Sequence, residues 1–413
     1  MSDIANNTDN VPAWVEAKLF ENVLKENVEN FKEIKEFKAY AGLAPGENYS
    51  TIMTRIEILI ELEDSSTDTK FFMLKTEHES KLYKELVEGM DCFGQEPKVY
   101  EQLIPAFEKL YHNVGQHIKF GAKYYKLPTA KGHLLLEDLC RRGFKNANRL
   151  DCLDMKHAKM TLKKLAQWHA ASAVHKENIG SYGEIYKTAT YHDIGRKGMS
   201  VFFEGMIKYL LKCLHLYDNP ELYKEKVEKL LNIIMDEIFK AVKIDENDFN
   251  VLNHADLWTN NIMFQYSPDG ELMDTYFVDY AFPKYGSPAQ DLLYFIISSL
   301  QVDIKIKQFD HLIQYYHENL VENLQLLKYT KKVPSLKDIH IMLHKYGIWG
   351  FATAVGVMAV ALVDSSEMST FDNFLGETND GDTFKLLMFT NKRYHKHMNA
   401  VLPWLLNRGA LDF

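Results

Sequence analysis

Apolar residues follow two different periods near the start of the chain. Val15, Leu19 and Val23 recur at a spacing of four, which predicts a capped amphipathic helix over residues 12–30. From residue 52 to residue 62, apolar residues alternate with charged ones, as in IEILIEL. Because successive side chains of a strand point to opposite faces, this alternation predicts a half-buried strand.

Three further segments continue the pattern up to residue 139. KFFMLK, which ends at Lys75, and HLLLEDL, residues 133–139, are short apolar runs of the length found in strands. Between them, residues 80–103 show helical spacing and carry Glu96. These segments therefore predict two more strands with a helix between them.

Helical patterns dominate the rest of the chain. A length of 413 residues exceeds one ordinary domain, so we expect two domains or lobes. The order of the elements predicts an α+β fold. In it, a smaller β-rich lobe, residues 1–137, precedes a larger, mainly helical lobe, residues 138–413.

The most apolar run is residues 348–363, IWGFATAVGVMAVALV. Its 16 residues fall short of the roughly 20 that a helix needs to cross a bilayer. We therefore expect a buried core helix here and no membrane span.

Polar residues gather around a predicted hairpin in HADLWTNNIMFQYSPDGELMDTYFVDY, residues 254–280. NIMFQY and DTYFVDY flank SPDGE, which has the composition of a turn. Because a hairpin reverses the chain, Asn261 at its entrance and Asp279 at its exit are expected to lie close together. Asp256 precedes Asn261 in the same loop, so three oxygen-bearing side chains converge at one end of the hairpin.

This set of side chains suits phosphoryl transfer. Magnesium takes oxygen ligands and in nucleotide sites is commonly held by one or two protein groups together with phosphates, which predicts Asn261 and Asp279 as its ligands. Asp256 can accept the proton of an attacking hydroxyl. Lys75, held in place by Glu96, can supply positive charge to the phosphates, with Glu77, Glu79 and Glu85 as alternative carboxylates for the role of Glu96.

Two other segments are candidates for nucleotide binding. The glycine-containing turn of residues 42–50 can bring the backbone of Asn48, Tyr49 and Ser50 close to phosphates, although it has neither the GxxxxGK[ST] nor the GxGxxG spacing. Glu137 follows a predicted strand at the junction of the lobes, where adenine would meet backbone groups. Ordinary turn and cap chemistry is the alternative for all such Asp, Asn and Ser residues.

At these motifs the sequence resembles a known family. The order of glycine turn, strand lysine, helix glutamate, HADLWTNN and VDY looks like the protein-kinase-like fold in its small-molecule form, shared by aminoglycoside phosphotransferases and choline kinases. LLLEDL, LAQWHAAS, HADLWTNNIMF and GSPAQDLLYF resemble the ecdysteroid kinase-like proteins of insects. This resemblance runs from Gly42 to the C-terminal NRGALDF.

The resemblance implies ATP-dependent, magnesium-assisted phosphorylation of a hydroxyl on a small molecule, with ecdysteroids or other hydroxylated lipophilic compounds as acceptors. By position, Asp256 matches the catalytic aspartate. The metal ligands and the phosphate-anchoring pair are matched by Asn261, Asp279, Lys75 and Glu96. There are two departures from the family pattern: Ala255 stands where glycine is usual, and Tyr280 where phenylalanine or a similar residue often follows the metal aspartate.

Other residues of these motifs are expected to support the scaffold. We predict that His254 is a buried histidine that fixes the catalytic loop through hydrogen bonds. Asp291 is predicted to cap a helix or to bind the catalytic-loop backbone. His169 lies on an apolar helix face and is predicted to be a hydrogen-bonded core histidine.

Aromatic and methionine side chains are frequent after residue 180. Such residues can line a pocket for a steroid-like body, because apolar cavities bind lipophilic ligands with few polar contacts. Core packing is their commoner role. The candidates are Phe202, Phe203, Met206, Tyr209, Trp349, Phe351 and Met358.

Composition narrows the class of partner. The net charge of −9 and the lack of long basic runs argue against nucleic acid and anionic membranes, and favour a small, uncharged or partly cationic partner. Four irregularly spaced cysteines and an N-terminus of 24 residues without a signal-type apolar core indicate free thiols in a reducing cytosol. We expect a cytoplasmic monomer.

Three functions stay open at this point. The first is a small-molecule kinase for an ecdysteroid, or for a choline-like or xenobiotic acceptor. The second is a nucleotide-binding or ligand-binding pseudokinase without catalysis. The third is a metal hydrolase using His254, Asp256 and Asp279, which would leave Lys75 and Glu96 without a role.

Overall fold

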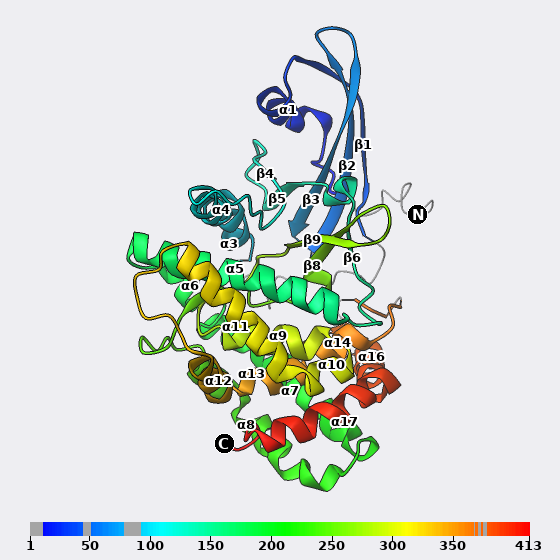
Figure 1. The fold of residues 1–413 in the computed structure, drawn as a ribbon. Helices are drawn as coiled ribbons and strands as arrows, with labels where there is room; N and C mark the ends of the chain where they lie inside the picture. Colours follow the sequence, from blue (N-terminus) through cyan, green and yellow to red (C-terminus); the bar gives the residue numbers. More distant parts are fainter. Residues whose placement is uncertain (1–10, 44–50, 78–91, 367, 371–372, 375–377) are drawn as a thin grey trace.

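The computed structural model describes residues 11–43, 51–77, 92–366, 368–370, 373–374 and 378–413. Figure 1 shows an antiparallel sheet from the N-terminal part of the chain at one end, and a larger helical part at the other. The fold is therefore mixed α+β, as the sequence predicts. The division into lobes at residue 137 remains a prediction.

The N-terminal sheet has five antiparallel strands in the order β1-β2-β3-β5-β4. They are β1 (Phe31–Ala41), β2 (Thr51–Leu62), β3 (Thr67–Glu77), β4 (Tyr124–Tyr125) and β5 (His133–Glu137). The three strands that the sequence predicts, β2, β3 and β5, are confirmed. Lys75 pairs with Met53 on β2 and with Leu134 on β5, so it stands on the central strand.

β1 has no alternating pattern, and the sequence does not predict it. Its apolar residues Phe31, Ile34 and Phe37 are spaced by three and pack against the core beneath the sheet. The register against β2 shifts between Phe31 and Glu33 and again between Ile34 and Glu36. Each bulge adds one residue, which converts a spacing of two into a spacing of three on the same face.

The N-terminal helix is shorter than predicted. It consists of a 3-10 turn, Ala17–Phe20, followed by α1, Glu21–Asn27, and neither has a side-chain cap. The prediction of a capped helix over residues 12–30 is therefore wrong at both ends. Val15 closes a separate turn by donating to the Pro12 carbonyl at 2.9 Å, and the positive φ of 57° at Asn30 turns the chain into β1.

The helix predicted over residues 80–103 is confirmed from Cys92 onward, and residues 78–91 lie outside the described part. It comprises α3 (Cys92–Lys98) and a π-helical turn (Val99–Leu103), and it continues as α4 (Ile104–His112). Its side chains from Val99 onward belong to the core of the helical part rather than to the core beneath the sheet.

Two small sheets lie beside the loop of residues 254–261. One has the order β6-β8-β9 and the other pairs β10 with β7. Their strands are β6 (Phe144–Asn146), β7 (Val251–Asn253), β8 (Ile262–Tyr266), β9 (Leu272–Phe277) and β10 (Lys284–Gly286). The predicted hairpin is confirmed as β8 and β9.

The helical part includes the 25-residue helix α5, Met155–Ile179. Trp168 of α5 is fully buried, and its indole N–H donates to the Leu252 carbonyl of β7 at 2.7 Å, which anchors the strand leading into the site. The other helices are α6 (Glu184–Thr188), α7 (Asp193–Cys213), α8 (Lys224–Ala241), α9 (Ala289–Ser299), α10 (Val302–Lys307), α11 (Phe309–Leu326), α12 (Leu336–Lys345), α13 (Ile348–Val355), α14 (Val357–Leu362), α16 (Asn379–Thr390) and α17 (Lys392–Asn407).

The apolar run of residues 348–363 is buried and helical, as predicted, but it forms two helices. α13 and α14 are separated at Gly356, where a Cβ would lie 2.9 Å from the Ala352 carbonyl oxygen and 3.2 Å from the Phe202 ring. Within the described residues, no single helix has the length and apolarity to cross a membrane. Among these residues, α12 and the α13–α14 segment reach that length and apolarity only when taken together, and the chain bends by 60° between them.

Candidate active site

The loop that enters the β8–β9 hairpin is held by one buried carboxylate. Asp291, at the start of α9, accepts the backbone N–H of His254 at 2.7 Å and that of Ala255 at 2.8 Å. Its Oδ2 also lies 3.1 Å from His169 Nε2, and His169 Nδ1 lies 2.8 Å from the Tyr316 hydroxyl. The predicted scaffold roles of Asp291 and His169 are both confirmed.

His254 ties this loop to the end of the hairpin. Its ring is fully buried, Nδ1 accepts the Asp256 N–H at 3.3 Å, and Nε2 donates to the Val278 carbonyl at 3.0 Å. Burial lowers the pKa of His254, which favours the neutral ring that these two contacts require. His254 is therefore a structural histidine, as predicted, and both of its ring nitrogens are occupied.

The two departures from the family pattern are accommodated locally. Ala255 has a φ of +65°, a backbone conformation that favours glycine. Tyr280 is fully buried, donates its hydroxyl to the Phe120 carbonyl at 3.2 Å, and stacks on His254 with ring centroids 4.6 Å apart. Neither departure displaces a group of the site.

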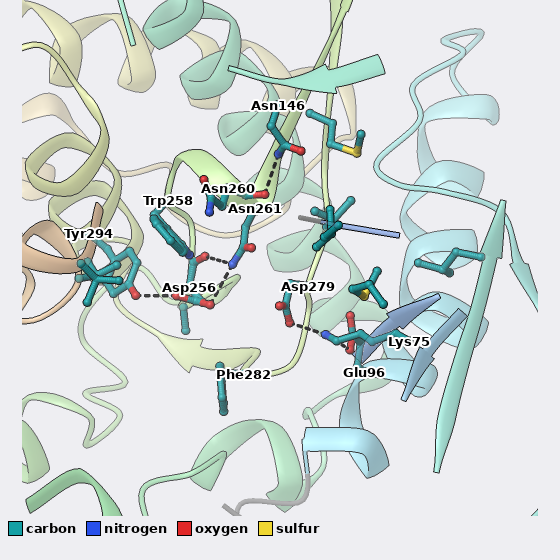
Figure 2. Close-up of a pocket in the computed structure, with 18 of the residues that line it drawn as sticks. Lys75, Glu96, Asn146, Asp256, Trp258, Asn260, Asn261, Asp279, Phe282 and Tyr294 are labelled. Atoms are coloured by element: carbon teal, nitrogen blue, oxygen red, sulfur yellow. Dashed lines mark hydrogen bonds and ion pairs between the residues drawn. The ribbon is translucent and has the colours of Figure 1, made fainter. Parts of the chain in front are cut away.

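The Asp256 carboxylate is held on both oxygens. Oδ1 accepts the Tyr294 hydroxyl at 2.5 Å and Oδ2 accepts the Asn261 side-chain N–H at 2.9 Å (Figure 2). Burial, with the nearby Asp279 carboxylate, raises the pKa of Asp256 to about 7. Such a group can take up a proton near neutral pH, which suits a general base.

Asn261 and Asp279 lie next to one another, as the hairpin predicts. The backbone carbonyl of Asn261 accepts the Val278 N–H at 3.0 Å, which joins the two ends of the hairpin. Because the Asn261 amide nitrogen donates twice to Asp256, its amide oxygen faces the Asp279 side in Figure 2. A carboxylate and an amide oxygen side by side are ligands of the kind magnesium takes, so the residues present fit that ion.

Lys75 forms the other half of the site. Its ammonium lies 2.7 Å from Glu96 Oε2 on α3 and 2.7 Å from Asp279 Oδ1. Burial disfavours the charged lysine, but the Asp279 and Glu96 carboxylates outweigh it and raise the pKa of Lys75. The predicted Lys75–Glu96 pair therefore exists, and it is joined directly to the hairpin.

The remaining nucleotide-binding candidates have different outcomes. Glu137 lines the same cavity at the end of β5, where its carboxylate accepts Arg142 at 2.6 Å. Asn48, Tyr49 and Ser50 lie outside the described residues, so their role stays a prediction.

One cavity of about 500 Å³ contains all the described site residues. Lys75, Glu96, Asp256, Asn261 and Asp279 line its polar part, and most of the remaining surface is apolar. Of the aromatic and methionine residues suggested for an acceptor pocket, Phe202, Phe203 and Trp349 line the cavity, whereas four lie outside its lining: Met206, Tyr209, Phe351 and Met358.

Sequence reasoning missed Tyr294. This residue stands in GSPAQDLLYF, three positions after Asp291, and residues at that spacing share a helix face. Once Asp291 is assigned to the catalytic loop, the spacing indicates that Tyr294 also faces it. Sequence reasoning also missed Tyr191, for which the signal is weaker. Tyr191 lines the cavity and accepts the side-chain N–H of Gln290, the neighbour of Asp291, at 3.3 Å.

A model of the ecdysteroid kinase-like family matches residues 45–329, which is more than half of the chain. The chain belongs to the ecdysteroid kinase-like family. Members of this family are generally kinases, which supports a small-molecule kinase-like function with ATP as the phosphate donor. A comparison with curated proteins gives no match.

Asp256→Asn should stabilise the ligand-free kinase-like protein in a pH-dependent way. Because burial raises the pKa of Asp256 above that of the unfolded chain, stability from its neutral form is complete below about pH 4 and is lost as the pH rises through about 7. We expect the variant to gain about 1–3 kcal/mol at pH 8.5 and little at pH 4, measured by thermal unfolding without ATP or metal.

Asp269→Asn, at the exposed tip of the hairpin, is the matched control and should show no such pH dependence. An equal gain in stability for Asp256→Asn at both pH values would contradict the raised pKa of the buried Asp256 carboxylate.

Ala255→Gly tests the backbone conformation of the catalytic loop. Glycine relieves the cost of a positive φ but adds entropy to the unfolded chain, so stability should stay unchanged or rise by up to about 1 kcal/mol. Ala255→Val, which is β-branched, should lose more than about 1 kcal/mol. Denaturant unfolding of both variants checks this, and a clear loss of stability in the glycine variant would contradict it.

Proposed function

We propose that the protein is an ATP-dependent small-molecule kinase that transfers the terminal phosphate of ATP to a hydroxyl of a lipophilic acceptor, such as an ecdysteroid. One observation carries the proposal. Lys75 paired with Glu96, and Asp256 beside Asn261 and Asp279, line a single cavity whose remaining wall is mainly apolar. Phosphate-binding, proton-accepting and acceptor-binding groups are thus within one space.

Asp256 is the proposed general base. It would accept the proton of the acceptor hydroxyl as the hydroxyl oxygen bonds to the terminal phosphorus and the bond to the leaving ADP breaks. Its raised pKa makes it a better proton acceptor than an exposed aspartate, and the Asn261 and Tyr294 hydrogen bonds fix the direction of its oxygens.

Lys75 would bind the phosphates of ATP, with Glu96 holding its ammonium in place. Asn261 and Asp279 would hold a magnesium ion, which when bound neutralises phosphate charge. Lys75 also pairs with Asp279 at 2.7 Å, so the two groups compensate each other's charge inside a buried site.

The adenine part of ATP would lie near β5. The apolar side chains of Met53, Met73, Leu136 and Met263 are among those that line the cavity, and Met73 pairs with Leu136 of β5. Flat apolar surfaces favour a planar base, and the backbone after β5 can give it hydrogen bonds. Glu137 is proposed to contribute through its backbone, since its side chain is paired with Arg142.

The rest of the cavity favours a neutral acceptor over a choline-like one. Its wall includes Phe202 and Phe203 of α7 and Trp349 of α13. A cationic acceptor would also suit these aromatic rings, so the feature that separates the two acceptor classes is a carboxylate free to pair with the cation. Apart from Asp256, the carboxylates that line the cavity within the described residues already have basic partners: Glu96 and Asp279 with Lys75, Asp138 with Arg55, and Glu137 with Arg142.

The other two functions are less well supported. A hydrolase with His254 as a metal ligand requires a ring nitrogen that is not otherwise bonded, and both nitrogens of His254 are occupied. A pseudokinase would be indicated by the loss of a reacting group, yet the residues at Lys75, Asp256, Asn261 and Asp279 are all of the reactive type.

Transfer of labelled terminal phosphate from ATP, with magnesium, onto a panel of ecdysteroids, hydroxylated plant compounds, choline and aminoglycosides tests the proposal. Transfer to a neutral lipophilic member is expected, and Asp256→Asn should reduce it by about 100-fold or more. Full activity of Asp256→Asn would exclude Asp256 as the base. Absence of magnesium-dependent ATP binding would overturn the kinase proposal altogether.

Phe202→Ala tests the apolar wall. Phe202 packs on Phe203 with centroids 4.9 Å apart and lies beside Gly356, where a Cβ would be 3.2 Å from its ring. Loss of the ring should raise the KM for a lipophilic acceptor about tenfold, because buried apolar contact is removed, while the KM for ATP stays the same. If only the KM for ATP changes, Phe202 does not belong to the acceptor pocket. Initial-rate kinetics with each substrate varied gives both constants.

A further inference from the structure

We infer that Tyr294 is a positioning residue for phosphoryl transfer: its hydroxyl locks the Asp256 carboxylate in the orientation that faces the acceptor. The inference rests on the proposed kinase function. It assigns a role to a side chain outside the set that the sequence motifs define.

The geometry around Asp256 carries the inference. The torsion that rotates an aspartate carboxylate is broad, so a single hydrogen bond leaves its oxygens free to swing. Here each oxygen has its own donor, Asn261 on Oδ2 at 2.9 Å and Tyr294 on Oδ1 at 2.5 Å. Figure 2 shows these donors on opposite sides of Asp256. Removing Tyr294 would leave only the Asn261 side of the carboxylate fixed.

The position of Tyr294 in α9 supports a role in the site rather than in the core. Every other residue of this helix is buried, and Tyr294 alone keeps partial exposure because it lines the cavity. Asp291, one turn earlier on the same helix, holds the backbone of His254 and Ala255. One rigid helix thus sets both the path of the loop and the direction of its carboxylate.

The Tyr294 hydroxyl is a fixed donor in this arrangement. Its burial and the adjacent Asp256 raise the pKa of Tyr294 well above the usual range, so it keeps its proton at any working pH. An oxygen of a carboxylate has two lone pairs, so Oδ1 can accept from Tyr294 and still accept the proton of an incoming hydroxyl.

Tyr294→Phe removes the hydroxyl and keeps the ring. With ATP and an ecdysteroid as substrates, kcat should fall about 10- to 100-fold, while the KM for ATP changes less than about twofold. Tyr217→Phe is the matched control, because it also removes one buried hydroxyl. The Tyr217 hydroxyl donates to the Phe389 carbonyl at 2.8 Å, and neither residue lines the cavity. The kcat and both KM values of the control should equal those of the wild type.

A double-mutant cycle separates positioning from a general effect on the fold. If Tyr294 acts through Asp256, adding Tyr294→Phe to Asp256→Asn should change the single-turnover transfer rate by less than about twofold. The same loss in both backgrounds would overturn the inference, as would an unchanged kcat. A raised acceptor KM with normal kcat would make Tyr294 a binding group instead and would also overturn it.

Phosphate transfer by the wild type distinguishes a failure of this inference from a failure of the proposed kinase function. If the wild type transfers phosphate and the variant does so equally well, only the role of Tyr294 falls. If the wild type transfers none to the ecdysteroid or to any other acceptor of the panel, the kinase proposal falls, and the role of Tyr294 falls with it.

Discussion

The site depends on one buried charge, the carboxylate of Asp291. It is fully buried and accepts two consecutive backbone N–H groups of the loop that enters the β8–β9 hairpin, besides its contact with His169. A carboxylate without partners in this position would be very costly, and hydrogen bonds to a charged group contribute about 1.5–3 kcal/mol each. The loop can hold Ala255 in a left-handed conformation because these bonds fix the two peptides before its Cα. The donation of the Asp256 N–H to His254 Nδ1 fixes the peptide after it.

The second constraint is electrostatic and joins distant parts of the chain. Lys75 comes from the N-terminal sheet, Glu96 from the following helix, and Asp279 from the end of the β8–β9 hairpin. Together with Asp256, these groups place one ammonium among three carboxylates in a largely buried site. Such a cluster is unfavourable for folding. Functional sites are commonly less stable than the rest of a fold, so the cluster is consistent with the proposed binding of phosphates and a metal ion.

Much of the fold follows from local patterns, and the exceptions have local causes. Burial alternates from Thr54 to Glu61, which makes β2 predictable, and the turn residues SPDGE mark the hairpin. β1 is not predicted from its sequence, because two bulges convert its apolar spacing from two into three. The long apolar run near residue 356 is predicted as one helix, yet it is divided at Gly356, where the Phe202 ring lies 3.2 Å from the place of a Cβ. In both places the structure sets the residues against another element, and no local pattern contains that contact.

The sequence by itself determined which groups take part in the site. Asp256, Asn261 and Asp279 are tied together by the hairpin between them, and short-range chain geometry is enough to predict that they meet. Lys75 and Glu96 were predicted from a strand lysine and a helix carboxylate, and the family resemblance, now supported over residues 45–329, implied the same pair. Only the tertiary structure decided how these groups are oriented, because the partners that orient them come from elsewhere. Tyr294 and Asp291 reach the loop from α9, and Phe202 reaches the cavity wall from α7. Orientation depends on side-chain packing between separate elements, whose distances a linear sequence does not contain.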